Sequence, residues 1–205
     1  MTSSDMIKQE FAAPLGAADT GTLTITGGAS NLTLTGTELP DQLYQAWFRD
    51  ITPEIDAAAG VVGVHNRRRP HPFSRNRGSG QILLSDAVEW AVEIAGGASA
   101  VTADLSGVGV RRVSVAGGTA DISLTLPAPV GVVRLRFVGS ASRLAIHRPA
   151  GTGIGFFVGG GASRMVVDGR HVVAVGPGHE ERSSAANRYE LEITGGASEL
   201  SIDNG

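Results

Sequence analysis

The sequence predicts an all-β fold: a single-domain parallel β-solenoid of about seven two-strand rungs, with GGAS corners, over residues 1–205. Three observations predict it. A small tetrapeptide recurs along the chain, apolar residues recur at fixed offsets from it, and the spacing between central copies is nearly constant. Self-similarity at a fixed period is the signature of repeat folds, in which each unit packs only against its neighbours.

The tetrapeptide GGAS, or a close variant of it, occurs six times. Glycine readily adopts the positive φ of a tight corner, and small side chains suit a corner that recurs in layers about 4.8 Å apart. A phosphate-binding glycine loop would need a following helix, whereas apolar strand residues follow every copy. The copies begin at Gly27, Gly96, Gly117, Gly139, Gly160 and Gly195, and a seventh, degenerate copy aligns at Ala57.

Apolar residues flank each copy with the alternation of a β-strand. The positions two before the copy and five and seven after it are apolar throughout, as with Phe137, Leu144 and Ile146 around Gly139. The inward-facing parity changes across the tetrapeptide, which predicts a corner or bulge there. Copies 21 or 22 residues apart fit one turn of a flattened coil. An antiparallel sandwich is the alternative, but it does not explain identical corners at constant spacing.

Three inserted stretches interrupt the repeat. The first, at about residues 36–50, alternates apolar and polar residues and predicts added strand structure; the second, at about 66–80, predicts an exposed loop. The third, at about 169–188, predicts a short strand and a polar loop. Stacking also predicts that the residues four positions after the first residue of each copy form one column, in which residues of adjacent rungs lie side by side. The predicted neighbours are Asp121 with Arg143 and Arg164 with Glu199.

Four stretches of the sequence resemble a known bacterial family, the toastrack-type β-solenoid domains, also called adhesin domains of unknown function. They are LYQAWFRDITPEI, GGASAVTADL, GGTADISLTLPAPVG and RYELEITGGASEL. The resemblance runs from about Phe11 to Asp203, and its motifs are structural. It implies a β-solenoid and, as in many relatives, a connection with envelope-stress sensing through attached membrane segments. It provides no catalytic residues.

Composition limits the functional classes. The chain has a net charge of −3 and no cysteine, so neither a general nucleic-acid binder nor a disulfide framework is indicated. No signal peptide and no apolar run of membrane-spanning length is visible, which predicts a cytoplasmic protein without an integral membrane segment. None of the five histidines has metal-ligand spacing, and no nucleophile, base and acid combine. We therefore expect no enzyme, cofactor, metal or catalytic residue.

The strongest chemical anomaly is a basic segment with no acidic residue. Such a segment can bind nucleic-acid phosphates or an anionic membrane, although a solvated loop is the simpler interpretation. The candidate binding residues are Arg67, Arg68, Arg69, Arg75 and Arg77.

The last rung, near the end of the sequence, predicts a second candidate surface. If its strand lies at an open end of the stack, its unpaired backbone groups favour pairing with another chain. We therefore expect a homo-oligomer or a protein partner there, involving Tyr189, Leu200 and Ile202. The function predicted first is a non-enzymatic interaction or scaffold module that self-assembles. The alternatives are polyanion binding through Arg67–Arg77 and a sensor of an envelope-stress system.

Overall fold

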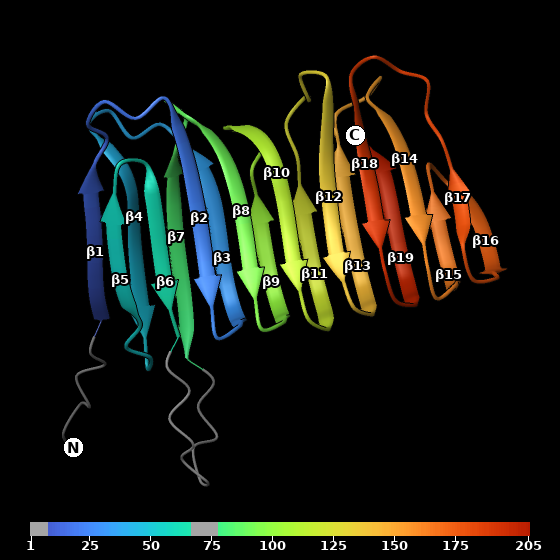
Figure 1. Ribbon diagram of the computed structural model, residues 1–205, viewed down its shortest axis with the longest axis horizontal. Coiled ribbons are helices and arrows are strands. Elements are labelled where there is room, and N and C mark those ends of the chain that lie inside the picture. Colours follow the sequence, from blue (N-terminus) through green and yellow to red (C-terminus); the bar gives the residue numbers. More distant parts are fainter. Residues whose placement is uncertain (1–7, 67–77) are drawn as a thin grey trace, which may run out of the picture.

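The computed structural model describes residues 8–66 and 78–205, and every regular element in these ranges is a β-strand (Figure 1). The strands are β1 (Lys8–Pro14), β2 (Thr20–Thr26), β3 (Ala29–Thr37), β4 (Gln42–Arg49), β5 (Glu54–Ala58), β6 (Val61–His65), β7 (Ser79–Ser85), β8 (Glu89–Ala95), β9 (Ala98–Asp104), β10 (Gly109–Ala116), β11 (Thr119–Thr125), β12 (Val132–Val138), β13 (Ala141–Arg148), β14 (Gly153–Val158), β15 (Ala162–Val167), β16 (Arg170–Val175), β17 (His179–Glu181), β18 (Arg188–Ile193) and β19 (Ala197–Asn204). The predicted all-β class is confirmed. The described residues contain no helix long and apolar enough to span a bilayer.

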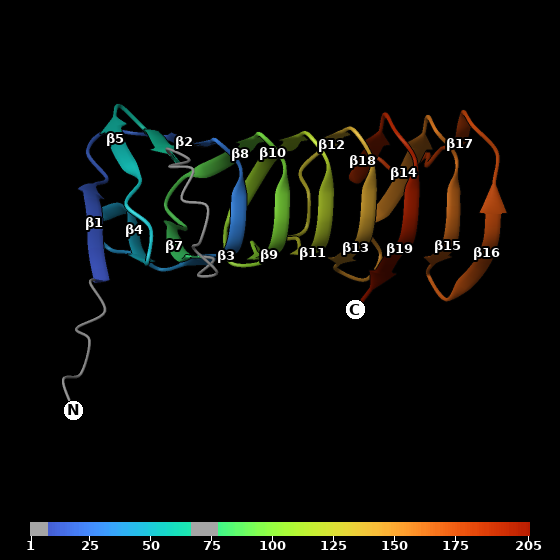
Figure 2. The ribbon, with the colours of Figure 1, turned by 90° about the horizontal axis from the view of Figure 1, so that it is seen from below.

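The strands form two facing sheets, which run side by side along the length of the molecule (Figure 2). Sheet A has the order β1-β4-β7-β3-β9-β11-β13-β19-β15-β16, and sheet B has the order β17-β14-β18-β12-β10-β8-β2-β6-β5. Each repeat unit gives one strand to each sheet, and neighbouring units pair in parallel. Ile122 lies between Val101 and Leu144 in register, as the stacking predicted. Antiparallel strands at both ends make the sheets mixed.

The core lies between the two sheets and consists of the inward-facing columns read from the sequence. Phe137 is 1% exposed in sheet B, and Leu144 and Ile146 are equally buried in sheet A. Burial of apolar surface contributes roughly 25 cal/mol per Å², so these continuous columns are the main stabilising term. Because the solenoid buries its apolar side chains between the sheets, its outer faces are free to carry polar side chains.

The change of parity occurs at a bulge inside the sheet A strand, not at the glycine pair. On β11, both Thr119 and Ile122 face inward and are 6% exposed, although they are three residues apart. Asp121 between them has a φ of 55°, which turns the strand by one position. The same left-handed residue recurs in the other units at Asn31, Ala100, Arg143, Arg164 and Glu199.

The degenerate copy at Ala57 was aligned wrongly. Ala57 belongs to β5, which forms an antiparallel hairpin with β6. Val62 and Val64 on β6 pair with Leu23 and Ile25 on β2, so they occupy the columns that precede a tetrapeptide rather than those that follow it. The apolar alternation at Val62 and Val64 is that of a buried strand, as predicted, but this strand belongs to sheet B rather than to sheet A.

The strands of the last repeat lie inside the stack. β18 pairs with β12 on one side and β14 on the other, and β19 pairs likewise with β13 and β15. The predicted open edge at Tyr189, Leu200 and Ile202 is therefore wrong: their exposed fractions are 0%, 1% and 0%. At the other end, β2 and β3 are inserted in the same way, between β6 and β8 and between β7 and β9.

The inserted stretches build the ends of the stack. The first provides β4, which pairs antiparallel with β1 and β7, and the third provides β16 and β17, which cover β15 and β14. Both predictions of added strands are confirmed. Of the second stretch, residues 67–77 lie outside the described residues.

Candidate functional site

A groove of about 680 Å³ lies on the outer face of sheet B, towards the end formed by β17. Its floor consists of outward side chains from adjacent strands, which the parallel register aligns in rows. One row contains Arg112 on β10, Arg134 on β12 and Glu190 on β18. The edge strand β17 and the residues after it form one wall. The groove is therefore a product of the stacking, because its residues come from units far apart in sequence.

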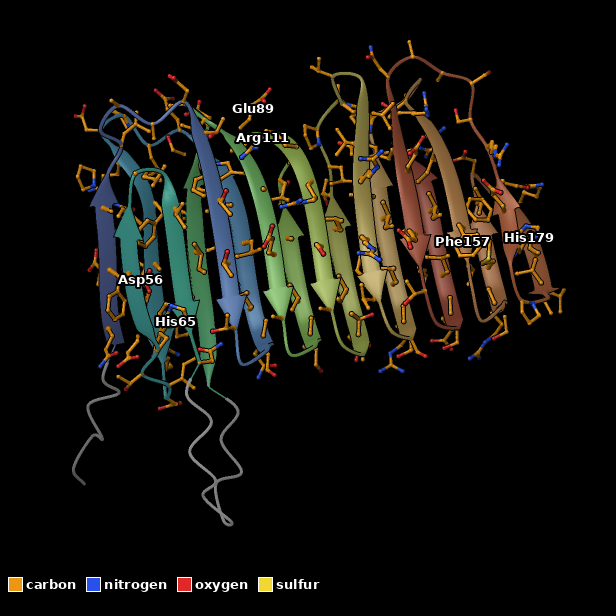
Figure 3. The ribbon with its side chains drawn as sticks, viewed as in Figure 1. Asp56, His65, Glu89, Arg111, Phe157 and His179 are labelled. Atoms are coloured by element: carbon orange, nitrogen blue, oxygen red, sulfur yellow. The ribbon has the colours of Figure 1, made fainter. Side chains whose placement is uncertain are left out.

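A missing side chain allows this wall to approach the floor. A Cβ atom on Gly155 of β14 would lie 3.2 Å from the backbone oxygen of Glu181 and 3.3 Å from the backbone nitrogen of Ser183. The ring of Phe156 also contacts His179, with ring centroids 5.9 Å apart. Next to it, Phe157 is 37% exposed, and it lies with His179 at this end of the molecule (Figure 3). The groove thus has a partly apolar end.

Every carboxylate that lines the groove is in an ion pair with an arginine. The pairs are Glu93 with Arg112, Glu180 with Arg182 at 2.7 Å, Glu181 with Arg170, Glu190 with Arg188 at 2.8 Å, and Glu192 with Arg136 at 3.2 Å. The hydrogen bond from Arg182 lowers the pKa of Glu180. Each acid that lines the groove therefore has a positive partner.

Arg134 is the exception among the arginines that line the groove. Its side chain is exposed, and within the described residues it forms no ion pair or hydrogen bond. Its neighbours in the row are Arg112, which binds Glu93, and Glu190, which accepts two hydrogen bonds from Arg188. A guanidinium group in this position can donate two parallel hydrogen bonds to a carboxylate, phosphate or sulfate. The groove therefore presents one unpaired cation among neutralised pairs.

None of the five predicted binding arginines lies in the part of the chain that the structure describes. Arg67, Arg68, Arg69, Arg75 and Arg77 lie outside the described residues. The residue before them, Asn66, lies at a solenoid corner, where its backbone N–H donates to the Thr26 carbonyl and its side chain to the Gly28 carbonyl. That corner belongs to the first GGAS copy and lies away from the groove residues of β12 and β18.

A hydroxyl, an imidazole and a carboxylate meet on the outer face of sheet B at its other end, where Figure 3 labels Asp56 and His65. His65 Nε2 lies 2.7 Å from Asp56 Oδ1, and His65 Nδ1 lies 2.8 Å from Thr26 Oγ1. A Cβ atom on Gly63 would lie 2.9 Å from the Asp56 carboxylate, so the glycine makes room for the pair. The Asp56 side chain is 72% exposed, so water screens these interactions and they serve to connect β5, β6 and β2.

A second hollow, of about 820 Å³, follows the corners along sheet A. It is lined by the small residues of the tetrapeptides, including Ser99, Ser142 and Ser198. No charged side chain lines it. Among the described residues, no three histidine or acidic side chains gather into a metal-binding group.

Sequence reasoning missed the groove, although a signal for it exists. The outward-facing residues of β12 include Arg134 and Arg136, and those of β18 include Glu190 and Glu192. Two arginines opposite two glutamates indicate adjacent strands with a charged outer face. The signal becomes visible only when β12 and β18 are known to be neighbours.

Comparison with known proteins identifies the family. The model of the N-terminal domain of toast_rack (Toast_rack_N, DUF2154) matches residues 3–130. The crystal structure of "a putative cell adhesion protein" from Clostridium sporogenes ATCC 15579 has a TM-score of 0.67 and 17% identity, over 98% of this chain and 100% of that one. That of "a putative adhesin (BF0245)" from Bacteroides fragilis NCTC 9343 has a TM-score of 0.36 and 11% identity, over 99% and 98%. No curated protein matches.

The C. sporogenes structure shares the fold over the whole length of both chains, and at 17% identity the likeness is one of fold alone. The family match covers more than half of the sequence and includes three of the six tetrapeptide copies, those that begin at Gly27, Gly96 and Gly117. Of the residues that line the groove, it includes only those on β8 and β10. Most groove residues, including Arg134, follow residue 130. The resemblance read from the sequence is confirmed, and the chain belongs to the Toast_rack_N family.

Proposed function

We propose that this chain is a non-enzymatic interaction module that binds a partner protein in the groove on sheet B, with Arg134 holding an anionic group of the partner. The observation that carries the proposal is the charge distribution of the groove. Each lining carboxylate has an arginine partner, and Arg134 alone among the lining arginines has no acid bound to it. In this proposal the scaffold is a single domain of about seven rungs.

The ion pairs favour binding over proton-transfer catalysis. A general acid or base works best with a pKa near the working pH. In the groove, the hydrogen bond between Arg182 and Glu180 moves both pKa values away from neutrality, since it lowers that of Glu180 and raises that of Arg182. Fixed charges of this kind orient a ligand rather than exchange protons with it.

The groove best fits an extended protein segment with a carboxylate next to an apolar side chain. Arg134 can bind the carboxylate through two hydrogen bonds, and the exposed ring of Phe157 can pack against the apolar group. The paired arginines and glutamates around them suit a rim that satisfies polar groups of the segment. The fold shared with "a putative cell adhesion protein" is compatible with such a role.

The test is a peptide library displayed on phage and selected on the wild-type protein. We expect the selected peptides to contain Asp or Glu beside an apolar residue. Charge-assisted hydrogen bonds contribute about 1.5–3 kcal/mol, so Arg134→Ser should weaken binding of the selected peptides about tenfold or more. The measurement is isothermal titration calorimetry with each peptide.

Arg49→Ser is the matched control, because Arg49 is also an exposed arginine without an ion pair among the described residues but lies on β4 of sheet A. Binding that is equally weakened in both variants would reflect net charge alone and contradict the proposal. Selection of peptides without an acid, or full affinity in Arg134→Ser, would also contradict it. Polyanion binding through Arg67–Arg77 is a separate hypothesis, because neither variant alters that segment. Envelope-stress sensing is also a separate hypothesis.

A further inference from the structure

Sheet A ends at β16, whose outer edge is exposed. β16 pairs with β15 on its inner side, and no described strand lies on its outer side. Val173 in its middle is 83% exposed, one of the two most exposed large apolar side chains in the described part of the chain. Figure 2 shows β16 at the extreme end of the stack, beyond β15. Its backbone can therefore accept a further strand.

The apolar columns of the core continue into β16. Val172 is in register with Met165, which belongs to the column of Leu144 and Leu200, and Val175 is in register with Ala162. Both valines pack against the core but are only partly buried. Their outer flank is open because the sheet stops there, so one more strand would bury them.

The other sheet edges carry charges or proline, which discourage pairing with another chain. β1 contains Glu10 and Pro14, and β5 contains Glu54 and Asp56. β17 has two glutamates in three residues. By contrast, β16 has its arginine at its first residue, Arg170, and the four residues from Val172 to Val175 include no charged residue and no proline. An exposed hydrophobic edge without charge or proline is a template for pairing with another chain.

We propose that β16 pairs antiparallel with β16 of a second copy of this chain, across a two-fold axis between Val173 and Ala174. The strand is complementary to itself in this arrangement. Val172 lies opposite Val175 of the partner subunit, and both positions face the core side of sheet A. Arg170 stays in its own ion pair with Glu181, beyond the paired residues, so no like charges meet. A two-fold contact of this kind uses the same patch on both subunits.

The test is the mass of the purified full chain, measured by sedimentation velocity over a concentration series. We expect a monomer–dimer equilibrium in the wild type. Val173→Glu places two carboxylates beside the two-fold axis, and like charges on facing strands are destabilising. We expect this variant to be monomeric where the wild type is dimeric, with the dissociation constant raised at least tenfold. Circular dichroism would verify that the variant keeps its fold.

Val130→Glu is the matched control, because Val130 is 87% exposed but lies between β11 and β12, outside any strand. This variant should dimerise like the wild type. A second arm tests the two-fold geometry: Val173→Lys should be monomeric alone, yet form a dimer when mixed with Val173→Glu, since opposite charges then meet. A monomeric wild type, a dimer unaffected by Val173→Glu, an equal loss in Val130→Glu, or no recovery on mixing would each overturn the proposal.

The β16 interface is independent of the groove. Arg134 lies on β12 of sheet B, so Arg134→Ser should leave the dimer intact, and Val173→Glu should leave peptide binding intact. Failure of one proposal is thus distinguishable from failure of the other.

Discussion

At the corner that begins at Gly117, the two adjacent glycines have different roles. Gly117 has a φ of 110°, and a Cβ atom there would lie 2.6 Å from the backbone nitrogen of Gly97 in the neighbouring unit. Gly118 does not have a positive φ, and a Cβ atom on it would meet nothing within 4 Å. At this corner, only the first of the two glycines is therefore required by the close stacking on the neighbouring unit.

We predict that Gly117→Ala destabilises the protein and that Gly118→Ala does not. A strained backbone position costs about 1–3 kcal/mol, and the contact with Gly97 adds to the cost. A surface change without such features is usually within about 0.5 kcal/mol. Urea unfolding followed by circular dichroism measures both values. Equal stabilities of the two variants would show that the corner can relax, contrary to this reasoning.

At the scale of an element, an arginine at the end of β13 occupies a position that is leucine in the two preceding units. Leu105, Leu126 and Arg148 occupy equivalent inward positions in successive units, joined by backbone hydrogen bonds between neighbouring strands. The Arg148 side chain is 3% exposed, and its guanidinium donates to both oxygens of Asp168, at 2.9 and 2.7 Å. This column of the core therefore ends on an ion pair, in which Arg148 is buried, instead of a further leucine.

We predict that the two halves of this pair respond differently to substitution. Asp168→Asn leaves the buried Arg148 uncompensated, which costs about 3–5 kcal/mol in a fully buried pair and less here, because the Asp168 side chain is 39% exposed. Asparagine also tolerates the φ of 49° at this position. Arg148→Leu continues the leucine column and leaves an aspartate that water can reach, so we expect it to be much milder. Urea unfolding at pH 7 measures both; a greater loss in Arg148→Leu would contradict this account.

The effect of Asp168→Asn should depend on pH. The hydrogen bond from Arg148 lowers the pKa of Asp168 below its ordinary value of about 3.9. A carboxyl group with a lowered pKa in the folded state stabilises the protein above its unfolded pKa, and this contribution is lost as the pH falls through the folded value. The difference between wild type and variant should thus be complete at pH 7 and smaller at pH 3. A difference that is constant or larger at pH 3 would argue against the ion pair.

For the whole molecule, the order of strands in space differs from their order in sequence at both ends. β19 is the last strand of the sequence but lies between β13 and β15, whereas β16 lies at the edge. We predict that backbone amides of β19 exchange with deuterium as slowly as those of β11, and far more slowly than those of β16. Hydrogen exchange measured by mass spectrometry tests this. Exchange of β19 together with β16 would show that the inserted rung opens as an end.

Much of the fold could be read from the sequence because the repeat is local and regular. The apolar columns predicted that Ile122 and Leu144 are neighbours. The charged column, formed by the residues four positions after the start of each tetrapeptide, predicted the ion pairs Asp121–Arg143 and Arg164–Glu199. The insertion of the last unit could not be read from spacing, since that unit has the same motif as the others. The spatial order of the units depends on which strands pair, and some of these strands are distant in sequence. A periodic pattern does not specify those pairings.

One signal for the insertion was present in the charged column. In sequence order the column reads Asp121, Arg143, Arg164, Glu199, which would place two arginines side by side. In space Glu199 lies between Arg143 and Arg164, so the charges alternate. The groove was missed for the same reason, since Arg134 and Glu190 become neighbours only through this insertion.

The inserted rung also determines how the molecule responds to mechanical force. In a stack whose spatial order follows the sequence, tension at the chain end peels the outermost rung and breaks one ladder in each sheet. Here, tension at the C-terminal end acts on β18 and β19, each of which is hydrogen-bonded on both flanks. β19 is loaded first and must break its ladders with β13 and β15 at once, and β18 must then break those with β12 and β14. The load on each strand is therefore shared between two neighbours, and the end resists unravelling under tension.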